Sequence, residues 1–291
     1  MLTAGLGAAL AAAFVWGVYI YLLKRLFVGY HPATLVVLLN TFALAWYLPV
    51  TLTQTGNPSR SLSGFGLPEL GGVVLTSVMT ATALILFLWA LTDGDVSYVT
   101  PINKTVPMFV LPMEVILLGQ VLTPVQVAGV VVTTVAVYVA NYEARGLLQP
   151  IRRARHSRPA QLALVSAVCF AVGDLGKRLS LQELAIETTL WVPLLILGVL
   201  VVLLPVALRH PPSLTRSDIP KLALGGLLVA LGEHLTTLAF AVLPASLASP
   251  LINTQAIVAV LLGGLLLRER AFRIRLVAAV LAVVGVALIA L

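Results

Sequence analysis

The sequence predicts an all-α membrane protein in which ten transmembrane helices form two inverted five-helix repeats around a central cavity. Three observations support this fold class: an extreme composition, ten apolar segments of membrane-spanning length, and a similarity between the two halves of the chain. Of the 291 residues, 60% are apolar and only 10% are charged, and the mean hydropathy is +1.05. Soluble domains carry about 25% charged residues, so this chain has too few polar side chains to cover a water-exposed surface. The composition excludes an ordinary soluble enzyme, and it also excludes a disordered chain.

Ten apolar segments account for most of the chain. They cover residues 2–23, 32–52, 69–91, 96–118, 123–142, 160–179, 187–208, 219–243, 246–267 and 273–291. Each has roughly the 20 residues that a helix needs to cross the hydrocarbon core of a bilayer. Because that core offers no water to satisfy open backbone groups, each segment is predicted to be helical. The protein is therefore expected in the cell membrane, as a multi-pass protein surrounded by lipid.

The two halves of the chain look like repeats. The longest polar stretch, residues 143–159, separates residues 1–142 from residues 160–291, and each half contains five segments. Both halves have proline after Ser or Thr in their fourth segment, at Pro101 and, 149 positions later, at Pro250. An odd number of spans gives two copies opposite orientations, which is a transporter architecture with the substrate site between the repeats. We therefore predict two five-helix repeats joined by a basic cytoplasmic linker.

Basic residues lie mainly on the linker side of the predicted membrane. Fourteen lysines and arginines are on that side and three are on the other, namely Arg60, Lys177 and Arg178. The positive-inside rule then places the linker in the cytoplasm and both termini outside. Since these charges sit in short loops between apolar segments, the net charge of +7 records orientation and predicts no nucleic-acid partner.

A sequence pattern after the fourth segment identifies a family. Residues 119–129 read GQVLTPVQVAG, and they match, except for Gln120, a pattern of Gly-Glu followed at fixed spacing by Thr or Ser, Gln and Gly. The corresponding place in the second half keeps Glu269 but not the rest of the pattern. With its duplicated five-helix unit, the chain resembles the ten-helix EamA-type members of the drug/metabolite transporter superfamily over essentially its whole length.

The resemblance implies a secondary transporter or exporter of small metabolites, often amino acids or related compounds. It also implies cytoplasmic termini, whereas the charge count predicts termini outside the cell. A neutral amide cannot carry a proton, so Gln120 is interpreted as a structural residue.

Lys104 is the charged residue closest to the middle of a predicted span. An ionisable group at this depth costs about 2.5–3.5 kcal/mol on insertion scales, so it requires a role. Pro101 and Pro107 loosen the same segment and leave carbonyl groups without their helical partners. Lys104, next to Asn103, is predicted to bind an anionic group of the substrate; the alternative is a structural pair with an intramembrane acid. Glu114, nearer the outer boundary, is interpreted as a packing or gating group.

Glu233 and His234 lie in the middle of the eighth segment. Either side chain could exchange a proton during transport, or Glu233 could bind a substrate amine or Lys104. The alternative is an interhelical pair between Glu and Lys or Glu and His. Consecutive residues point about 100° apart on a helix, so only one of the two is expected to face the cavity fully.

Two further groups of polar residues lie in the sixth and ninth segments. Asp174, Lys177 and Arg178 have i,i+3 and i,i+4 spacing, which permits a local ion pair on one helix face or a gate. Asn253 and Gln255 follow Pro250 and are interpreted as substrate contacts or as bridges between helices.

Trp16 and Tyr19 of the first segment are predicted to form part of a cavity wall. The chain contains no nucleophile elbow, phosphate loop, zinc motif or haem spacing, so it predicts no enzyme, metal or cofactor. The sequence therefore predicts a secondary-active transporter, an exporter of a small polar metabolite such as an amino acid or related carboxylate. Alternating access with proton coupling is the expected mechanism, in a monomer or a homodimer. The alternative is a membrane enzyme or assembly factor acting on lipid-linked intermediates.

Overall fold

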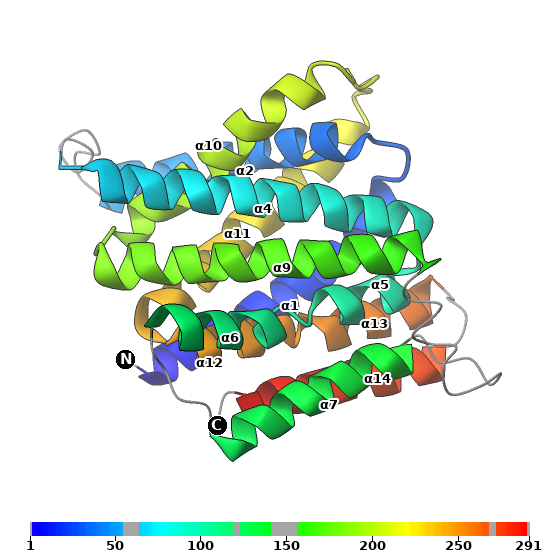
Figure 1. The fold of residues 1–291 in the computed structure, drawn as a ribbon. Coiled ribbons are helices and arrows are strands. Elements are labelled where there is room, and N and C mark those ends of the chain that lie inside the picture. Colours follow the sequence, from blue (N-terminus) through cyan, green and yellow to red (C-terminus); the bar gives the residue numbers. More distant parts are fainter. Residues whose placement is uncertain (1, 55–63, 119–122, 141–155, 268–271, 290–291) are drawn as a thin grey trace.

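The computed structural model describes residues 2–54, 64–118, 123–140, 156–267 and 272–289. Within these ranges the chain forms helices and loops, with no β-strand. The elements are α1 (Leu2–Leu26), α2 (Pro32–Gln54), α4 (Leu67–Asp93), α5 (Val96–Asn103), α6 (Pro107–Leu118), α7 (Pro124–Ala140), α9 (Arg158–Arg178), the π-helical η1 (Leu179–Glu183), α10 (Thr188–Ala207), α11 (Asp218–Val242), α12 (Ala245–Asn253), α13 (Gln255–Leu266) and α14 (Phe272–Ile289). Figure 1 shows them packed as one bundle.

Seven helical stretches in the described ranges are long and apolar enough to cross a membrane. They are α1, α2, α4, α9 with η1, α10, α11, and α12 with α13. All ten predicted segments contain helix, but the fourth is split into α5 and α6, and α7 has 17 described residues where a span needs roughly 20. The all-helical fold is confirmed, whereas the count of ten crossings stays a prediction. The predicted linker lies mostly outside the described residues.

Helices from the two halves of the chain pair with each other. α1 packs along α11, α4 along α9, α7 along α14, and α2 along α10. The α7–α14 pair lies at one side of the bundle in Figure 1. Exchanging equivalent helices of the two halves converts the α1–α11 pair into the α9–α4 pair and leaves α7–α14 and α2–α10 unchanged. This is the pattern expected for two repeats around an approximate two-fold axis.

The fourth and ninth segments, in which a proline follows Thr or Ser, are both interrupted. The α5–α6 break follows Asn103, and there the Thr105 hydroxyl donates to the Ile102 carbonyl at 2.8 Å. The α12–α13 break is at Thr254, whose hydroxyl donates to the Leu251 carbonyl at 2.7 Å. In each case the backbone N–H of the same threonine also donates to that carbonyl, at 3.3 Å from Thr105 and 3.2 Å from Thr254, so the hydroxyl adds a second hydrogen bond at the break. The prediction of a loosened fourth segment is thus confirmed, and the ninth segment has the same construction.

The close approach of α1 to α11 depends on Gly232. A Cβ atom there would lie 2.7 Å from Cε2 of the Trp16 ring, so a larger residue would displace the ring. One turn further along α11, the Thr236 hydroxyl accepts a hydrogen bond from Trp16 Nε1 at 3.0 Å. A small residue and an interhelical hydrogen bond together hold these two helices in register.

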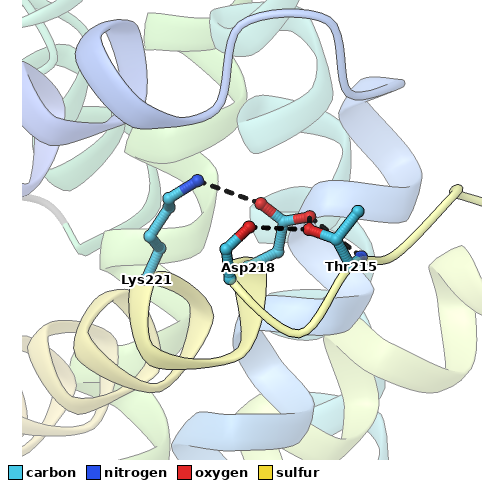
Figure 2. Close-up of polar contacts among 4 residues, drawn as sticks. Thr215, Asp218 and Lys221 are labelled. Atoms are coloured by element: carbon cyan, nitrogen blue, oxygen red, sulfur yellow. Dashed lines mark hydrogen bonds and ion pairs between the residues drawn. The ribbon is translucent and has the colours of Figure 1, made fainter.

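Polar contacts determine where α11 begins. Asp218 Oδ2 accepts hydrogen bonds from the Thr215 hydroxyl at 2.6 Å and the Thr215 backbone N–H at 3.1 Å, as Figure 2 shows. Lys221 Nζ lies 3.0 Å from the other carboxylate oxygen. A carboxylate in the first turn also complements the positive end of the helix dipole. These contacts anchor the loop between α10 and α11.

Candidate functional site

A central cavity lies between the helices of both halves. It contains about 1130 Å³ of space not filled by atoms, including its opening to solvent. Helices α1, α2, α4, α9, α10 and α11 contribute to its wall, together with both helix breaks. Its polar lining residues are Trp16, Tyr19, Asn40, Thr80, Lys104, Asp174, Lys177, Glu233, Thr236, Asn253 and Gln255.

Helical periodicity explains why these side chains meet at the cavity. On α9, the lining residues Phe170, Gly173, Asp174 and Lys177 follow the i, i+3, i+4, i+7 spacing of a single helix face. On α11, Glu233 and Thr236 have the corresponding i, i+3 spacing. Each helix therefore presents one face to the cavity, and that face carries its cavity-lining charged side chains.

Lys104 lies at the α5–α6 break, and its side chain lines the cavity. The residue is only 8% exposed. Its ammonium lies 5.2 Å from the ring centroid of Phe87 and 4.9 Å from that of Phe170. These cation–π contacts stabilise the charge, and no described carboxylate lies within ion-pair distance of it. Lys104 is therefore a cation held by aromatic faces and available to an anion in the cavity.

Glu233 forms an ion pair with Lys177. Lys177 Nζ lies 2.9 Å from Glu233 Oε2, and the two side chains are 7% and 15% exposed. Among the alternatives left by the sequence, this is an interhelical pair of Glu with Lys, but the partner is neither Lys104 nor His234. Lys177 also does not form the local pair with Asp174 that the i,i+3 spacing permitted, because its ammonium is directed to α11.

Asp174 is connected to the α12–α13 break by hydrogen bonds. The Ser249 hydroxyl donates to Asp174 Oδ2 at 2.6 Å. Asn253 Nδ2 donates to the Ser249 carbonyl at 2.7 Å and lies 3.2 Å from the Ser249 hydroxyl. This network joins α9 to α12 and positions a second carboxylate at the cavity wall.

Trp16, Tyr19 and Gln255 also line the cavity. The Tyr19 ring contacts Trp16 edge to face, with centroids 5.4 Å apart. Gln255, the first residue of α13, is 5% exposed. The structure thus brings these three predicted residues together with Lys104, Glu233 and Asn253.

Asn103 and His234 lie outside the cavity lining. Asn103 Nδ2 donates to the Ser166 hydroxyl at 2.9 Å and so connects α5 to α9. His234 Nδ1 lies 2.7 Å from the Tyr47 hydroxyl on α2. As expected for consecutive helical residues, Glu233 faces the cavity and His234 faces a neighbouring helix.

Arg178 and Glu114 lie away from the cavity, where α9, α6 and α12 pack together. Arg178 Nη2 is 3.4 Å from Glu183 Oε1 on η1, whereas its Nε and Nη1 atoms have no hydrogen-bond partner among the described residues. Glu114 is fully buried, and its carboxyl oxygens have no hydrogen bond of good geometry in the described chain, although the Ser246 side chain on α12 lies close enough to interact with them. Arg178 attracts this carboxyl group electrostatically without reaching ion-pair distance.

Several residues at or behind the cavity wall were not singled out from the sequence. Phe87 and Phe170 contact Lys104, Thr236 bonds to Trp16, and Ser249 bonds to Asp174. Helical spacing from Asp174 would have indicated Phe170, because residues four apart share a helix face. Phe87 and Ser249 lie on other helices, so only the packing reveals them. In the described ranges there is no group of three His, Cys, Asp or Glu residues that could hold a metal ion.

Comparisons with known proteins agree with this architecture. A sequence model of the EamA-like transporter family matches residues 3–142 and again residues 158–291. A solved crystal structure has the same fold, with a TM-score of 0.69 and 17% identity over 97% of this chain and 96% of that one. No curated protein matches the chain.

Proposed function

Because the chain belongs to the EamA-like transporter family, we propose that it is a secondary-active transporter that carries a small carboxylate-bearing metabolite, such as an amino acid, through the central cavity. The observation that carries this proposal is the ammonium of Lys104, which lines the cavity and has no carboxylate partner among the described residues. A substrate carboxylate can supply the missing counter-charge.

The arrangement of the helices supports alternating access around this cavity. Two helix breaks, at Lys104 and at Thr254, come from equivalent segments of the two halves, and residues at both breaks line the cavity. Discontinuous helices at a repeat interface are typical of secondary transporters, in which one bundle rocks against the other. We propose ten crossings in two inverted repeats as the frame for this motion.

Proton coupling, in this proposal, acts through Glu233. A proton on its carboxylate would break the pair with Lys177, whose ammonium lies 2.9 Å away at the cavity wall. The freed ammonium could then turn toward a substrate anion. Replacement by Glu233→Gln is expected to abolish the pH dependence of transport, and transport that keeps its full pH dependence would contradict this role.

Arg178 and Glu114 are proposed as a gate away from the binding residues. Arg178 holds Glu183 with one nitrogen while two others lack partners in the described chain, and Glu114 attracts it from α6. A small movement of η1 against α6 would exchange one carboxylate for the other. Such an exchange of partners gives a gate two discrete positions.

Reconstitution in proteoliposomes tests the function. A thermal-shift screen of amino acids and 2-oxo acids first selects a stabilising compound, whose uptake is then measured with radiolabel. Lys104→Met should lower uptake about 100-fold while leaving the protein folded. Lys221→Met is the matched control, because Lys221 pairs with Asp218 outside the cavity. Equal uptake by the Lys104→Met and wild-type proteins would remove Lys104 from the site and refute the proposal.

A further inference from the structure

Two opposite charges share the central cavity without forming an ion pair. Lys104 and Asp174 both line the cavity. Among the neighbouring cations, Asp174 is attracted most strongly by Lys177, whose ammonium is already paired with Glu233, and next by Lys104. In an environment of low dielectric constant this attraction is strong. Nevertheless, Lys104 Nζ and the Asp174 carboxylate are farther apart than 4.0 Å, since only Lys177 and Glu233 form an ion pair at the described cavity wall.

Other contacts hold each of the two groups away from the other. The Ser249 hydroxyl donates to Asp174 Oδ2 at 2.6 Å, a short distance typical of a charge-assisted hydrogen bond. Asn253 holds Ser249 in turn by hydrogen bonds to its carbonyl and hydroxyl oxygens. The rings of Phe87 and Phe170 stabilise the Lys104 ammonium without neutralising it.

Ser249 has a position suited to this task. It is fully buried on α12, behind the cavity wall, and it is not a lining residue. Its hydroxyl therefore acts on the cavity through the two lining residues that it contacts, Asp174 and Asn253. Asp174 is left with no other hydrogen-bond partner among the described residues, so removal of the hydroxyl frees this carboxylate to turn.

We propose that Ser249 is a positioning residue that holds Asp174 on the α12 side of the cavity and thereby keeps Lys104 available to a substrate carboxylate. This inference rests on the proposed function, because it assumes that Lys104 binds the anionic group. Without the Ser249 hydroxyl, Asp174 turns to Lys104, and the resulting internal pair competes with the substrate. Asp174 then acts as a built-in competitor, and Ser249 determines how strongly it competes.

The first experiment measures the availability of Lys104 without any substrate. Purified full-length protein is treated with acetic anhydride, and acetylation of Lys104 is followed by peptide mass spectrometry. Ser249→Ala should slow the acetylation of Lys104 about tenfold, the factor that corresponds to about 1.4 kcal/mol of new pairing. Ser249→Thr, which keeps the hydroxyl, should retain the wild-type rate. The acetylation rate of Lys221 serves as an internal reference in every sample.

A double variant separates positioning from a loss of folding. Ser249→Ala combined with Asp174→Asn lacks the Asp174 carboxylate that would capture Lys104, and Glu233 stays paired with Lys177, so Lys104 labelling should return to the wild-type rate. A general loss of structure would instead raise the labelling rate in both variants. Wild-type labelling of Lys104 in the Ser249→Ala protein, or slow labelling that persists in the double variant, would overturn the proposal.

Transport of the compound selected by the thermal-shift screen gives the second readout. Ser249→Ala should raise the KM about tenfold with little change in kcat, and the double variant should restore the KM. Changes in labelling that are not accompanied by a change in KM would leave Ser249 as the residue that positions Asp174 but would refute Lys104 as the substrate site. The two failures are therefore distinguishable.

Discussion

The two helix breaks are built alike but carry different chemistry. At each break a proline precedes the interruption, and a threonine hydroxyl donates to the carbonyl three residues earlier, from Thr105 to Ile102 and from Thr254 to Leu251. At equivalent positions, however, the first break presents Lys104 and the second presents Asn253. The two repeats share the proline and the threonine hydrogen bond at the break, whereas the side chain that lines the cavity differs between them.

This difference shows how a duplicated unit can form an asymmetric site. The charge of Lys104 has no described carboxylate partner and is flanked by aromatic rings. The amide of Asn253 is bonded within its own helix to Ser249, which holds Asp174. In the proposed mechanism, one break therefore offers a free charge to the substrate, and the other supports the wall that keeps this charge free.

The largest expected effect on transport comes from replacing the cavity-lining polar side chain at each break in turn. Lys104→Met should lower kcat/KM by about 100-fold, because a charge-assisted contact with the substrate contributes about 1.5–3 kcal/mol. Asn253→Ala should lower it by less than tenfold, since its amide acts through Ser249. Initial rates in proteoliposomes measure both. Equal losses of kcat/KM in the two variants would show that the side chains at the two breaks contribute equally to transport.

Loss of a paired charge should lower the free energy of unfolding more than loss of the Lys104 charge does, although Lys104 is expected to matter most for transport. Lys177→Met leaves Glu233 buried without its partner, so the free energy of unfolding should fall by about 3 kcal/mol. Lys104→Met removes an ammonium that pairs with no carboxylate in the described part of the chain, and stability should stay the same or rise. Chemical unfolding in detergent micelles measures these changes. The double variant Lys177→Met, Glu233→Gln should recover most of the loss, and failure to do so would contradict the pairing.

Threonine replacements test whether the two backbones are equivalent. Thr105→Val and Thr254→Val each remove one hydrogen bond to a carbonyl while conserving shape, so each should cost about 1 kcal/mol of stability. Thermal denaturation of the two variants side by side compares the breaks directly. A large loss of stability in only one of the two variants would mean that the same hydrogen bond contributes differently to stability at the two breaks.

The pH dependence of stability that arises from His31, which is remote from both breaks, provides a control for these comparisons. His31, in the loop before α2, stacks on His210 with ring centroids 3.9 Å apart. Burial, followed by the proximity of His210, lowers the pKa of His31. The unfolded chain therefore takes up this proton more readily, and stability present above about pH 6.5 is lost as the pH falls through the lowered pKa.

Only a small destabilisation is expected from His31, because the residue is only partly buried. His31→Asn should reduce the difference in melting temperature between pH 7.5 and pH 5.5. The same pH difference should persist in the Thr105→Val and Thr254→Val proteins. An unchanged pH dependence in His31→Asn would assign the effect to other groups.

Sequence reasoning located the helices and the principal charge, but not the partners of the charges. Pro101 and Pro107 predicted an interruption of the helix near Lys104, because proline removes a backbone hydrogen-bond donor wherever it occurs in a helix. The same reasoning left the partner of Glu233 open among several groups, and the structure selects Lys177, 56 residues away. Asn103 was predicted beside Lys104 at the site, yet it bonds to Ser166 on α9 instead.

By itself, the sequence determined the all-helical membrane fold, the duplication and the presence of a cation in mid-span. These properties follow from composition, from segment length and from local backbone chemistry, each of which acts within a few tens of residues. Only the tertiary structure decided that Lys177 pairs with Glu233, that Ser249 holds Asp174 from 75 positions away, and that Lys104 is left without a described carboxylate. The physical reason is that hydrogen bonds and ion pairs depend on distances of a few ångströms, which are determined by how distant helices pack.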